Sequence, residues 1–370
     1  MKEALLLTPG PTNVPERVMQ KGALPMIHHR TKEFQAVLER VNANLGKVFM
    51  TKHPVLYFAS SGTGAMEASI TNLLSKGDTI ISISAGKWGE RYRDIARAYG
   101  LDVKSFEIEY GRAVTADQVR EALKAHPQAK AVLVTLCETS TAVTHPIKEI
   151  AAITRNSSAM LFVDAISGLA CDPLLMDEWG VDVVVCGSQK GLMLPPGLSF
   201  VAVNERAQAA IATSTLPKYY FNFADTIKAM KKNDTPFTPA VSLIRALDEA
   251  LVMLVEEGME KVWARHAQVA KYVRETLTGL GLELFSKAAA NGLTAVIMPE
   301  SIPSKNIINH MRDKFQVVMA DGQGELQGKV VRFAHMGYAC TMKDAQKGFE
   351  AFCDAMAAAG YKHPQLTASR

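Results

Sequence analysis

The chain has 370 residues, of which 48% are hydrophobic and 21% are charged, and its formal net charge is +4. This length is too great for one compact core, so we expect a globular protein with two domains in a single chain. The basic residues are spread along the sequence, which argues against nucleic acid or an anionic membrane as a partner. No apolar run reaches membrane-spanning length, and residues 1–4 do not begin a signal peptide.

Five cysteines are dispersed along the sequence and lack the Cys-x-x-Cys spacing of metal sites. An odd, dispersed set is typical of reduced thiols in a cytosolic protein. We therefore expect a cytoplasmic location and no metal centre. The five are Cys137, Cys171, Cys186, Cys340 and Cys353.

Prolines in the first dozen residues prevent a regular helix and predict an extended arm, for which we expect the limits 1–20. An apolar helical pattern follows from Phe34 to Leu45, and residues 54–59 have the composition of a short buried strand. The turn Ser60-Ser-Gly-Thr-Gly-Ala-Met-Glu67 then begins a helix that runs to about Leu74. Free N–H groups and the helix dipole at such a start suit a phosphate group, although many ordinary helix caps have the same composition.

Short apolar strands alternate with helical patterns between residues 79 and 187, which predicts a mostly parallel sheet with helices on both faces. Trp88 lies in a loop, residues 85–89, where its ring could stack on a flat cofactor or belong to the core. The expected strands span 79–84, 101–106, 131–136, 159–164 and 181–187, and the expected helices span 90–99, 116–125 and 147–155.

The carboxyl end of the last of these strands presents Gln189 and Lys190, followed by Pro195-Pro-Gly197, which stiffens the loop. A lysine at the edge of a sheet, partly buried, suits a nucleophilic amine with a lowered pKa that forms a Schiff base with a carbonyl. The ordinary alternative is a solvated lysine in a strand-to-loop turn.

Asp164 ends another apolar strand, at residues 159–164. The number of residues between Asp164 and Lys190 leaves room for one crossover connection, so two neighbouring parallel strands could deliver both side chains to the same edge of the sheet. A carboxylate at that depth requires a cationic partner, and the protonated ring of pyridoxal phosphate supplies one. A helix cap or turn is the alternative role for Asp164.

Several motifs resemble class V aminotransferases of pyridoxal-phosphate (PLP) fold type I, most similar to the alanine–glyoxylate, serine–pyruvate and serine–glyoxylate group. They are Asp164-Ala-Ile-Ser, Gly187-Ser-Gln-Lys190, Pro195-Pro-Gly197 and Thr8-Pro-Gly-Pro-Thr12. The likeness runs from about Leu7 to about Ala357. It implies an α/β fold with a mostly parallel seven-stranded sheet between helices in a large domain, residues 21–257, and a smaller C-terminal α+β domain, residues 258–370.

The resemblance also implies roles for individual residues. The cofactor-binding residues are Ser61, Gly62 and Thr63 at the phosphate, Trp88 stacked on the ring, Thr139 beside the 3-oxygen, Asp164 on the ring nitrogen, Gln189, Lys190 as the Schiff-base lysine, and Thr238 at the phosphate of a neighbouring subunit. The substrate-binding residues are Pro9 and Gly10 of an arm that crosses onto the partner, and Arg332. Two positions depart from the family pattern: Ala142 stands where relatives commonly have glycine, and Thr235 where they often have tyrosine.

The C-terminal part predicts helices over 240–257 and 260–279, then strands at 281–285, 293–298 and 329–333 with helices over 305–314 and 343–357. Arg332 ends the last of these strands. Its guanidinium could hold the carboxylate of an amino acid through two parallel hydrogen bonds, or it could be an ordinary solvated arginine.

The function that the resemblance implies is amino transfer from alanine or serine to glyoxylate or pyruvate, by a ping-pong mechanism through a Lys190 Schiff base in a homodimer with shared active sites. One alternative is 2-aminoethylphosphonate–pyruvate transaminase, and a second is a lyase of the cysteine desulfurase kind. A third is a non-catalytic association subunit on the same fold.

Overall fold

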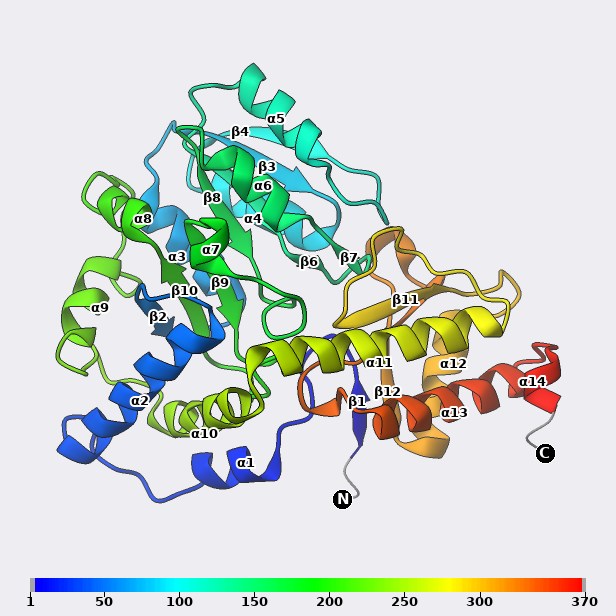
Figure 1. The fold of residues 1–370 in the computed structure, drawn as a ribbon. Coiled ribbons are helices and arrows are strands. Elements are labelled where there is room, and N and C mark those ends of the chain that lie inside the picture. The colour runs from blue at the N-terminus through cyan, green and yellow to red at the C-terminus, as the bar shows by residue number, and fades with distance from the viewer. Residues whose placement is uncertain (1–3, 368–370) are drawn as a thin grey trace.

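Two main β-sheets organise the chain in this computed structural model, which describes residues 4–367 (Figure 1). The larger sheet has the strand order β2-β10-β9-β8-β5-β3-β4, and the smaller has the order β1-β12-β13-β11. The strands of the larger sheet are β2 (Val55–Phe58), β3 (Thr79–Ser84), β4 (Asp102–Glu107), β5 (Ala131–Thr135), β8 (Met160–Asp164), β9 (Val183–Gly187) and β10 (Ser199–Val203). The strands of the smaller sheet are β1 (Leu5–Leu7), β11 (Leu293–Ile297), β12 (Val317–Asp321) and β13 (Val330–Ala334). A separate short hairpin pairs β6 (Cys137–Glu138) with β7 (Val143–Thr144).

The helices lie outside these sheets. In the first half of the chain they are α1 (Glu16–Gly22), α2 (Lys32–Val48), α3 (Gly62–Leu73), α4 (Lys87–Ala98), α5 (Ala116–Ala125), α6 (Ile147–Thr154) and α7 (Met176–Trp179). In the second half they are α8 (Glu205–Ala210), α9 (Phe223–Met230), α10 (Val241–Glu257), α11 (Met259–Gly279), α12 (Ser304–His310), α13 (Met342–Ala358) and α14 (Pro364–Thr367). A π-helical turn, Met311–Phe315, follows α12 directly.

The seven-stranded sheet is buried on both faces because its central strands β5, β8 and β9 are apolar at nearly every position before their carboxyl ends. Along β5, Ala131 and Leu133 pack into one hydrophobic cluster, and Val132 and Val134 pack into the cluster on the opposite face. Successive side chains of a strand point to opposite faces, so a continuous apolar run covers both. Every strand pair is parallel except those that β10 makes with β2 and β9.

The smaller sheet has a hydrophobic cluster of its own, which residues of α11, α12 and α13 complete. Helix α10 ends at Glu257, and the positive φ of 83° at the next residue, Gly258, allows a sharp change of direction. Helix α11 then runs across the molecule toward this sheet (Figure 1). The N-terminal strand β1 also belongs to it, because Leu5–Leu7 pairs in parallel with Val317–Met319. The two ends of the chain therefore contribute to one sheet.

The α/β fold with a mostly parallel seven-stranded sheet and a smaller C-terminal sheet is confirmed. The domain limits at 20/21 and 257/258 stay a prediction, and their outer ends at residues 1–3 and 368–370 lie outside the described residues. The strand predicted at 281–285 is wrong: the segment forms one isolated bridge, between Leu284 and Val296. The chain then turns away, because the N–H of Lys287 donates to the carbonyl of Gly111.

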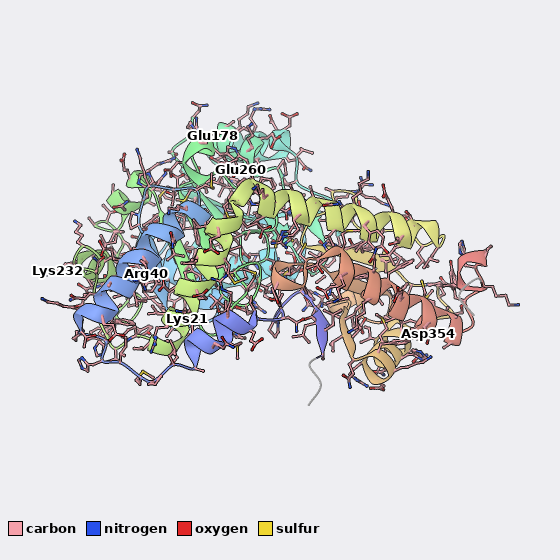
Figure 2. All side chains as sticks on the ribbon, turned by 60° about the horizontal axis from the view of Figure 1, so that its bottom comes forward. Lys21, Arg40, Glu178, Lys232, Glu260 and Asp354 are labelled. Carbon is pink, nitrogen blue, oxygen red and sulfur yellow. The ribbon has the colours of Figure 1, made fainter. Side chains whose placement is uncertain are left out.

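Charged side chains of both signs lie around the outside of the molecule. Figure 2 labels Lys21, Arg40 and Lys232 among the basic ones and Glu178, Glu260 and Asp354 among the acidic ones. Over residues 4–367 we find no helix that combines the length and the apolar character needed to cross a membrane.

Truncation of Leu7 to Ala tests the contribution of β1 to the smaller sheet. Leu7 is fully buried against this sheet, so Leu7→Ala should lower the free energy of unfolding by about 2–5 kcal/mol, the usual range for a buried leucine. The matched control is Leu24→Ala, at a position that is 43% exposed, where we expect a change of about 0.5 kcal/mol or less. Urea denaturation followed by circular dichroism measures both, and equal losses in the two variants would contradict the role of β1.

Candidate active site

Two neighbouring parallel strands deliver the central pair of side chains to one edge of the large sheet. Asp164 is the last residue of β8, and Lys190 lies three residues beyond the end of β9. The two strands pair in parallel, with Asp164 opposite Val185, so their carboxyl ends meet at the same edge. The expected neighbourhood of Asp164 and Lys190 is thereby observed.

A cavity of about 570 Å³ opens at this edge, between the large sheet and the smaller one. Every site residue that the sequence suggested, except Thr238, lines it: Pro9, Gly10, Ser61, Gly62, Thr63, Trp88, Thr139, Asp164, Gln189, Lys190 and Arg332. Five further polar or reactive residues line the cavity and had no predicted role in the site: Thr8, Arg91, Cys137, Ser167 and Gln323. Arg91 could have been noticed, because it lies three residues after Trp88 and shares its helix face.

The Lys190 side chain is buried, and burial lowers the pKa of its amine to about 8. Its Nζ donates a hydrogen bond to the carbonyl oxygen of Pro9. A lysine with this pKa has a substantial fraction of neutral amine near pH 7.5, whereas an ordinary lysine has almost none. The neutral form is the nucleophile that attacks a carbonyl carbon.

The N-terminal segment forms one wall of the same cavity. A Cβ atom on Gly10, whose φ is 101°, would lie 2.4 Å from Cδ of Lys190, so only glycine fits against the lysine. Pro9 and Gly10 contact Lys190 of their own chain, while the crossing of the arm onto a partner subunit stays a prediction. The pairing of β1 with β12 holds the segment beside this site.

Asp164 is buried, and burial raises the pKa of its carboxyl to about 7. One of its oxygens accepts a hydrogen bond of 2.9 Å from the N–H of Ile166. The charges of Lys190 and Arg91 favour its ionised form only in part, and a cationic ligand atom beside it would favour that form further.

The first turn of α3 supplies free backbone donors to the cavity. The helix begins at Gly62, and the side chain of Ser61 at its N-cap makes no capping hydrogen bond. The N–H groups at such a start have no partner within the helix and carry the positive end of its dipole. A Cβ atom on Gly62 would lie 2.5 Å from Cδ1 of Ile166, so the backbone is closely fitted to that side chain.

Trp88 lies in the first turn of α4, which begins at Lys87, so its predicted position in a loop is wrong. The buried carboxylate of Glu138 explains the earlier start. It accepts hydrogen bonds from the N–H groups of Trp88 at 3.0 Å and Gly89 at 3.1 Å, and thus caps the helix from fifty residues away. Ser140 supplies two further donors to the same carboxylate.

Arg332 enters the cavity from β13 and is 5% exposed. Its Nε donates to the carbonyl of Asp321 at 2.7 Å, and its Nη1 donates to the carbonyl of Thr139 at 3.2 Å. Burial lowers the pKa of the guanidinium to about 10, which leaves it charged near neutral pH. A positioned, charged arginine of this kind is suited to hold a carboxylate.

Four buried polar atoms at the cavity make no hydrogen bond with the described residues: Nε1 of Trp88, Oγ1 of Thr139, and Oε1 of Gln189 and of Gln323. Buried polar groups almost always have partners, so these atoms indicate a ligand with several acceptors and donors. Together with the α3 start, Asp164 and Lys190, they fit a flat phosphorylated ring that carries an aldehyde, as in PLP. No cluster that could hold a metal ion is present among residues 4–367.

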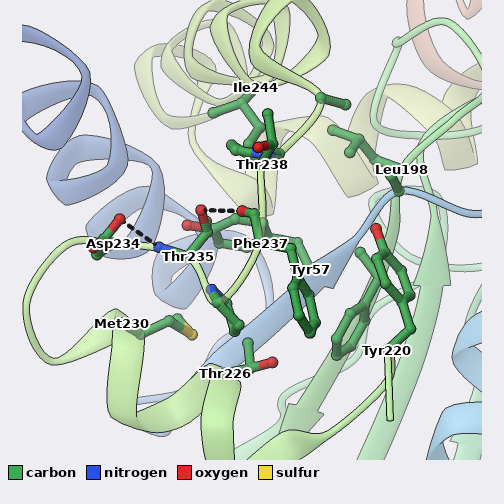
Figure 3. A pocket seen from close by; sticks show the side chains of 15 residues that line it. Tyr57, Leu198, Tyr220, Thr226, Met230, Asp234, Thr235, Phe237, Thr238 and Ile244 are labelled. Carbon is green, nitrogen blue, oxygen red and sulfur yellow. Dashed lines mark hydrogen bonds between the residues drawn. The ribbon is translucent and has the colours of Figure 1, made fainter. Parts of the chain in front are cut away.

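Thr238 lies outside this cavity. It lines a second, smaller pocket together with Tyr57, Tyr220 and Ile244, as Figure 3 shows. In the same segment the hydroxyl of Thr235 donates to the carbonyl of Phe237 at 2.8 Å. The structure of the single chain therefore does not bring Thr238 to Lys190.

Ala142, the other departure from the family pattern, adopts a positive φ of 58° and is fully buried. This left-handed conformation is ordinarily taken by glycine and costs alanine about 1 kcal/mol. The backbone therefore keeps the geometry that glycine would favour.

The family description Aminotransferase class-V matches residues 4–345. The chain belongs to the class V aminotransferases. Members of this family are PLP-dependent transaminases, so the expected enzyme class is confirmed.

Proteins with similar sequences or structures have names of different kinds. The small subunit of a soluble hydrogenase from Synechococcus sp. (strain PCC 6716) is 39% identical over 344 residues, which cover 91% of this chain and 88% of that protein. The L-aspartate–glyoxylate aminotransferase of Paracoccus denitrificans (strain Pd 1222) is 36% identical over 343 residues, which cover 90% and 86%. The crystal structure of an alanine–glyoxylate aminotransferase from Nostoc sp. superposes with a TM-score of 0.92 at 28% identity and covers 96% of both chains.

The raised pKa of Asp164 predicts a pH dependence of stability in cofactor-free protein. Because the folded carboxyl binds its proton more tightly than the unfolded one, the carboxyl lowers stability as pH rises from about 4 to about 7, and this loss is complete above pH 7. Asp164→Asn removes the effect and can still accept from Ile166. The variant should gain about 4 kcal/mol over wild type between pH 4 and pH 8, at about 1.4 kcal/mol for each pKa unit. Urea denaturation at the two pH values measures the difference, and parallel pH profiles would contradict the prediction.

Proposed function

We propose that this protein is a PLP-dependent aminotransferase that moves the amino group of alanine or serine to glyoxylate or pyruvate. The observation that carries the proposal is that Lys190, Asp164 and Arg332 line one cavity beside the free N–H groups of α3. When bound, PLP supplies an aldehyde that exchanges amino groups and a ring that takes up negative charge.

The residues present divide the work of holding this cofactor. Lys190 would hold the aldehyde carbon covalently, and Asp164 would accept a hydrogen bond from the protonated ring nitrogen. Ser61, Gly62 and Thr63 would hold the phosphate at the start of α3. Trp88 would cover the ring, with Thr139 and Gln189 as polar neighbours.

The chain also positions the substrate and moves a proton. Arg332 would bind the carboxylate of the amino acid through its charged guanidinium, which fixes the α-carbon near Nζ of Lys190. Nζ, once free, would take the α-proton as a base, a role for which its pKa of about 8 is suited. The closely packed wall at Gly10 limits the entry of water beside Lys190.

Relatives support the choice of keto acid more than the choice of amino donor. Aminotransferases named for glyoxylate recur among the similar proteins, with aspartate in one name and alanine in another. Cys137 and Cys171 are buried, and burial raises their thiol pKa values well above the ordinary range. A nucleophilic thiolate of the cysteine desulfurase kind is therefore not favoured.

One observation favours a second candidate, a non-catalytic association subunit: the similarity to a protein named as a hydrogenase small subunit. The complete set of Lys190, Asp164 and Arg332 in one cavity supports catalysis instead.

The absorbance spectrum of the purified protein, followed as amino donors are added singly, tests the proposal. We expect a visible band from the lysine-bound cofactor, and alanine or serine should convert it to the pyridoxamine form more efficiently than aspartate or 2-aminoethylphosphonate. Lys190→Ala should lower steady-state transamination at least about 10³-fold, because it removes both the covalent attachment and the base. Circular dichroism should show the variant folded.

The outcomes separate the candidates. Absence of the band even with added PLP would favour the association subunit, and conversion by the phosphonate alone would favour the phosphonate transaminase. Arg332→Gln provides a further control: kcat/KM for alanine should fall about 10–100-fold through loss of a charge-assisted pair. An unchanged value would remove Arg332 from the substrate site.

We further propose a homodimer in which Thr238 of one subunit contacts the phosphate in the other. Thr238 lies outside its own chain's cavity, beside an exposed aromatic stack in which Phe237 contacts Tyr219 and Tyr220. Large exposed aromatic side chains are typical of interfaces.

Subunit complementation tests this arrangement. Lys190→Ala and Thr238→Arg proteins should each be nearly inactive alone, but co-expression should restore about a quarter of wild-type activity, since half of the dimers are mixed and each has one intact site. No recovery, with a sedimentation mass near that of one 40.2 kDa chain, would contradict the shared site.

We also place the enzyme in the cytoplasm. The described cysteines are all free thiols, as in a reducing compartment. Cell fractionation with an antibody against the protein checks this location.

A further inference from the structure

The cavity is lined by more positively charged side chains than negatively charged ones. The cations are Lys190, Arg332 and Arg91, and the carboxylate is Asp164. A ligand with the charge of PLP adds a phosphate of about two negative charges and a ring nitrogen that Asp164 can pair. The site therefore needs one cation that is free to face the phosphate.

Two of the three cations are already assigned by their contacts and by the proposed function, on which this inference rests. Nζ of Lys190 lies against Pro9 and Gly10, where the aldehyde would be held. The guanidinium of Arg332 donates to carbonyls of Asp321 and Thr139, on the side of the smaller sheet. Neither donates to the start of α3.

Arg91 is the cation that reaches the start of α3. Its Nη1 donates to Oγ1 of Thr63 at 3.2 Å, and Thr63 is the second residue of that helix. Its guanidinium carbon lies 4.3 Å from the centre of the Trp88 ring. Arg91 therefore bridges the tryptophan and the free N–H groups of α3.

The guanidinium of Arg91 is otherwise unused. Among residues 4–367, the bond to Thr63 is its one hydrogen bond, and no carboxylate lies within ion-pair distance. The neighbouring arginines of α4 differ, since Arg93 pairs with Asp94 and Glu107 and Arg97 pairs with Asp94. Four of the five N–H donors of Arg91 remain for a ligand.

We propose that Arg91 is a phosphate-binding residue of the cofactor site, donating from its guanidinium to the phosphate held at Gly62 and Thr63. A guanidinium offers two parallel donors that match two phosphate oxygens, and its charge complements the dipole of α3. The stacked ring of Trp88 keeps the guanidinium plane in place without neutralising it.

A comparison of two ligands that differ only in the phosphate tests this role. Pyridoxamine phosphate and pyridoxamine carry no aldehyde, so neither attaches covalently to Lys190. Their dissociation constants for the full-length, cofactor-stripped protein can be measured by equilibrium dialysis. Arg91→Gln should weaken pyridoxamine phosphate binding about 10–100-fold and leave pyridoxamine binding within about twofold. Arg91→Lys keeps the charge but loses the planar fork, so its dissociation constant for pyridoxamine phosphate should lie between those of wild type and Arg91→Gln.

Arg97→Gln is the matched control, since it removes an exposed arginine from the same helix outside the cavity. It should leave both dissociation constants unchanged, and melting temperatures should show all variants folded. Equal weakening of both ligands by Arg91→Gln would show that Arg91 acts only by positioning Trp88 and would overturn the proposal. Unchanged binding of both would overturn it too, with the proposed function intact. Failure of the wild-type protein to bind either ligand would instead overturn the proposed function together with this inference.

Discussion

The parallel pairing of β8 with β9 is the constraint on which the site depends. It places the carboxyl ends of two fully buried strands at one edge, so that Asp164 and Lys190 reach the same cavity from different parts of the chain. Their alternate side chains fill two separate hydrophobic clusters, and a slip by one residue would exchange the cluster into which every side chain packs. The hydrophobic core therefore determines which polar groups meet.

Burial at this edge changes the chemistry of both groups. The same loss of solvation shifts the pKa of Lys190 downward and that of Asp164 upward, so both become less charged than they are in water. A ligand that brings an aldehyde to the amine and a cation to the carboxylate relieves both penalties at once. The folding of the large sheet therefore leaves both groups poorly solvated, and the relief of this penalty contributes to the binding free energy of such a ligand.

The sequence was most informative where chemistry and local pattern coincide. Continuous apolar runs predicted β5, β8 and β9, and the polar residues at or just beyond their carboxyl ends pointed to Asp164 and Lys190. It was less informative where a partner is distant in the chain. The start of α4 at Lys87 depends on Glu138, and the short β1 depends on β12, so neither could be inferred from neighbouring residues.

Strand β12 was missed for a similar reason. Residues 317–321 alternate weakly and follow a π-helical turn, so they become a strand through pairing with β1 and β13. Arg91 was missed because an arginine on an amphipathic helix is usually solvated, and only the position of Thr63 distinguishes it from Arg93.

The membership of β1 in the smaller sheet also has a mechanical meaning. Pro9 and Gly10 follow β1 directly, and Arg332 lies on β13 of the same four-stranded sheet. The N–H of Thr12, two residues after Gly10, donates to the carbonyl of Gln189 beside the lysine. The wall segment is therefore anchored at both sheets, and the spacing between the amine and the guanidinium is held from two sides.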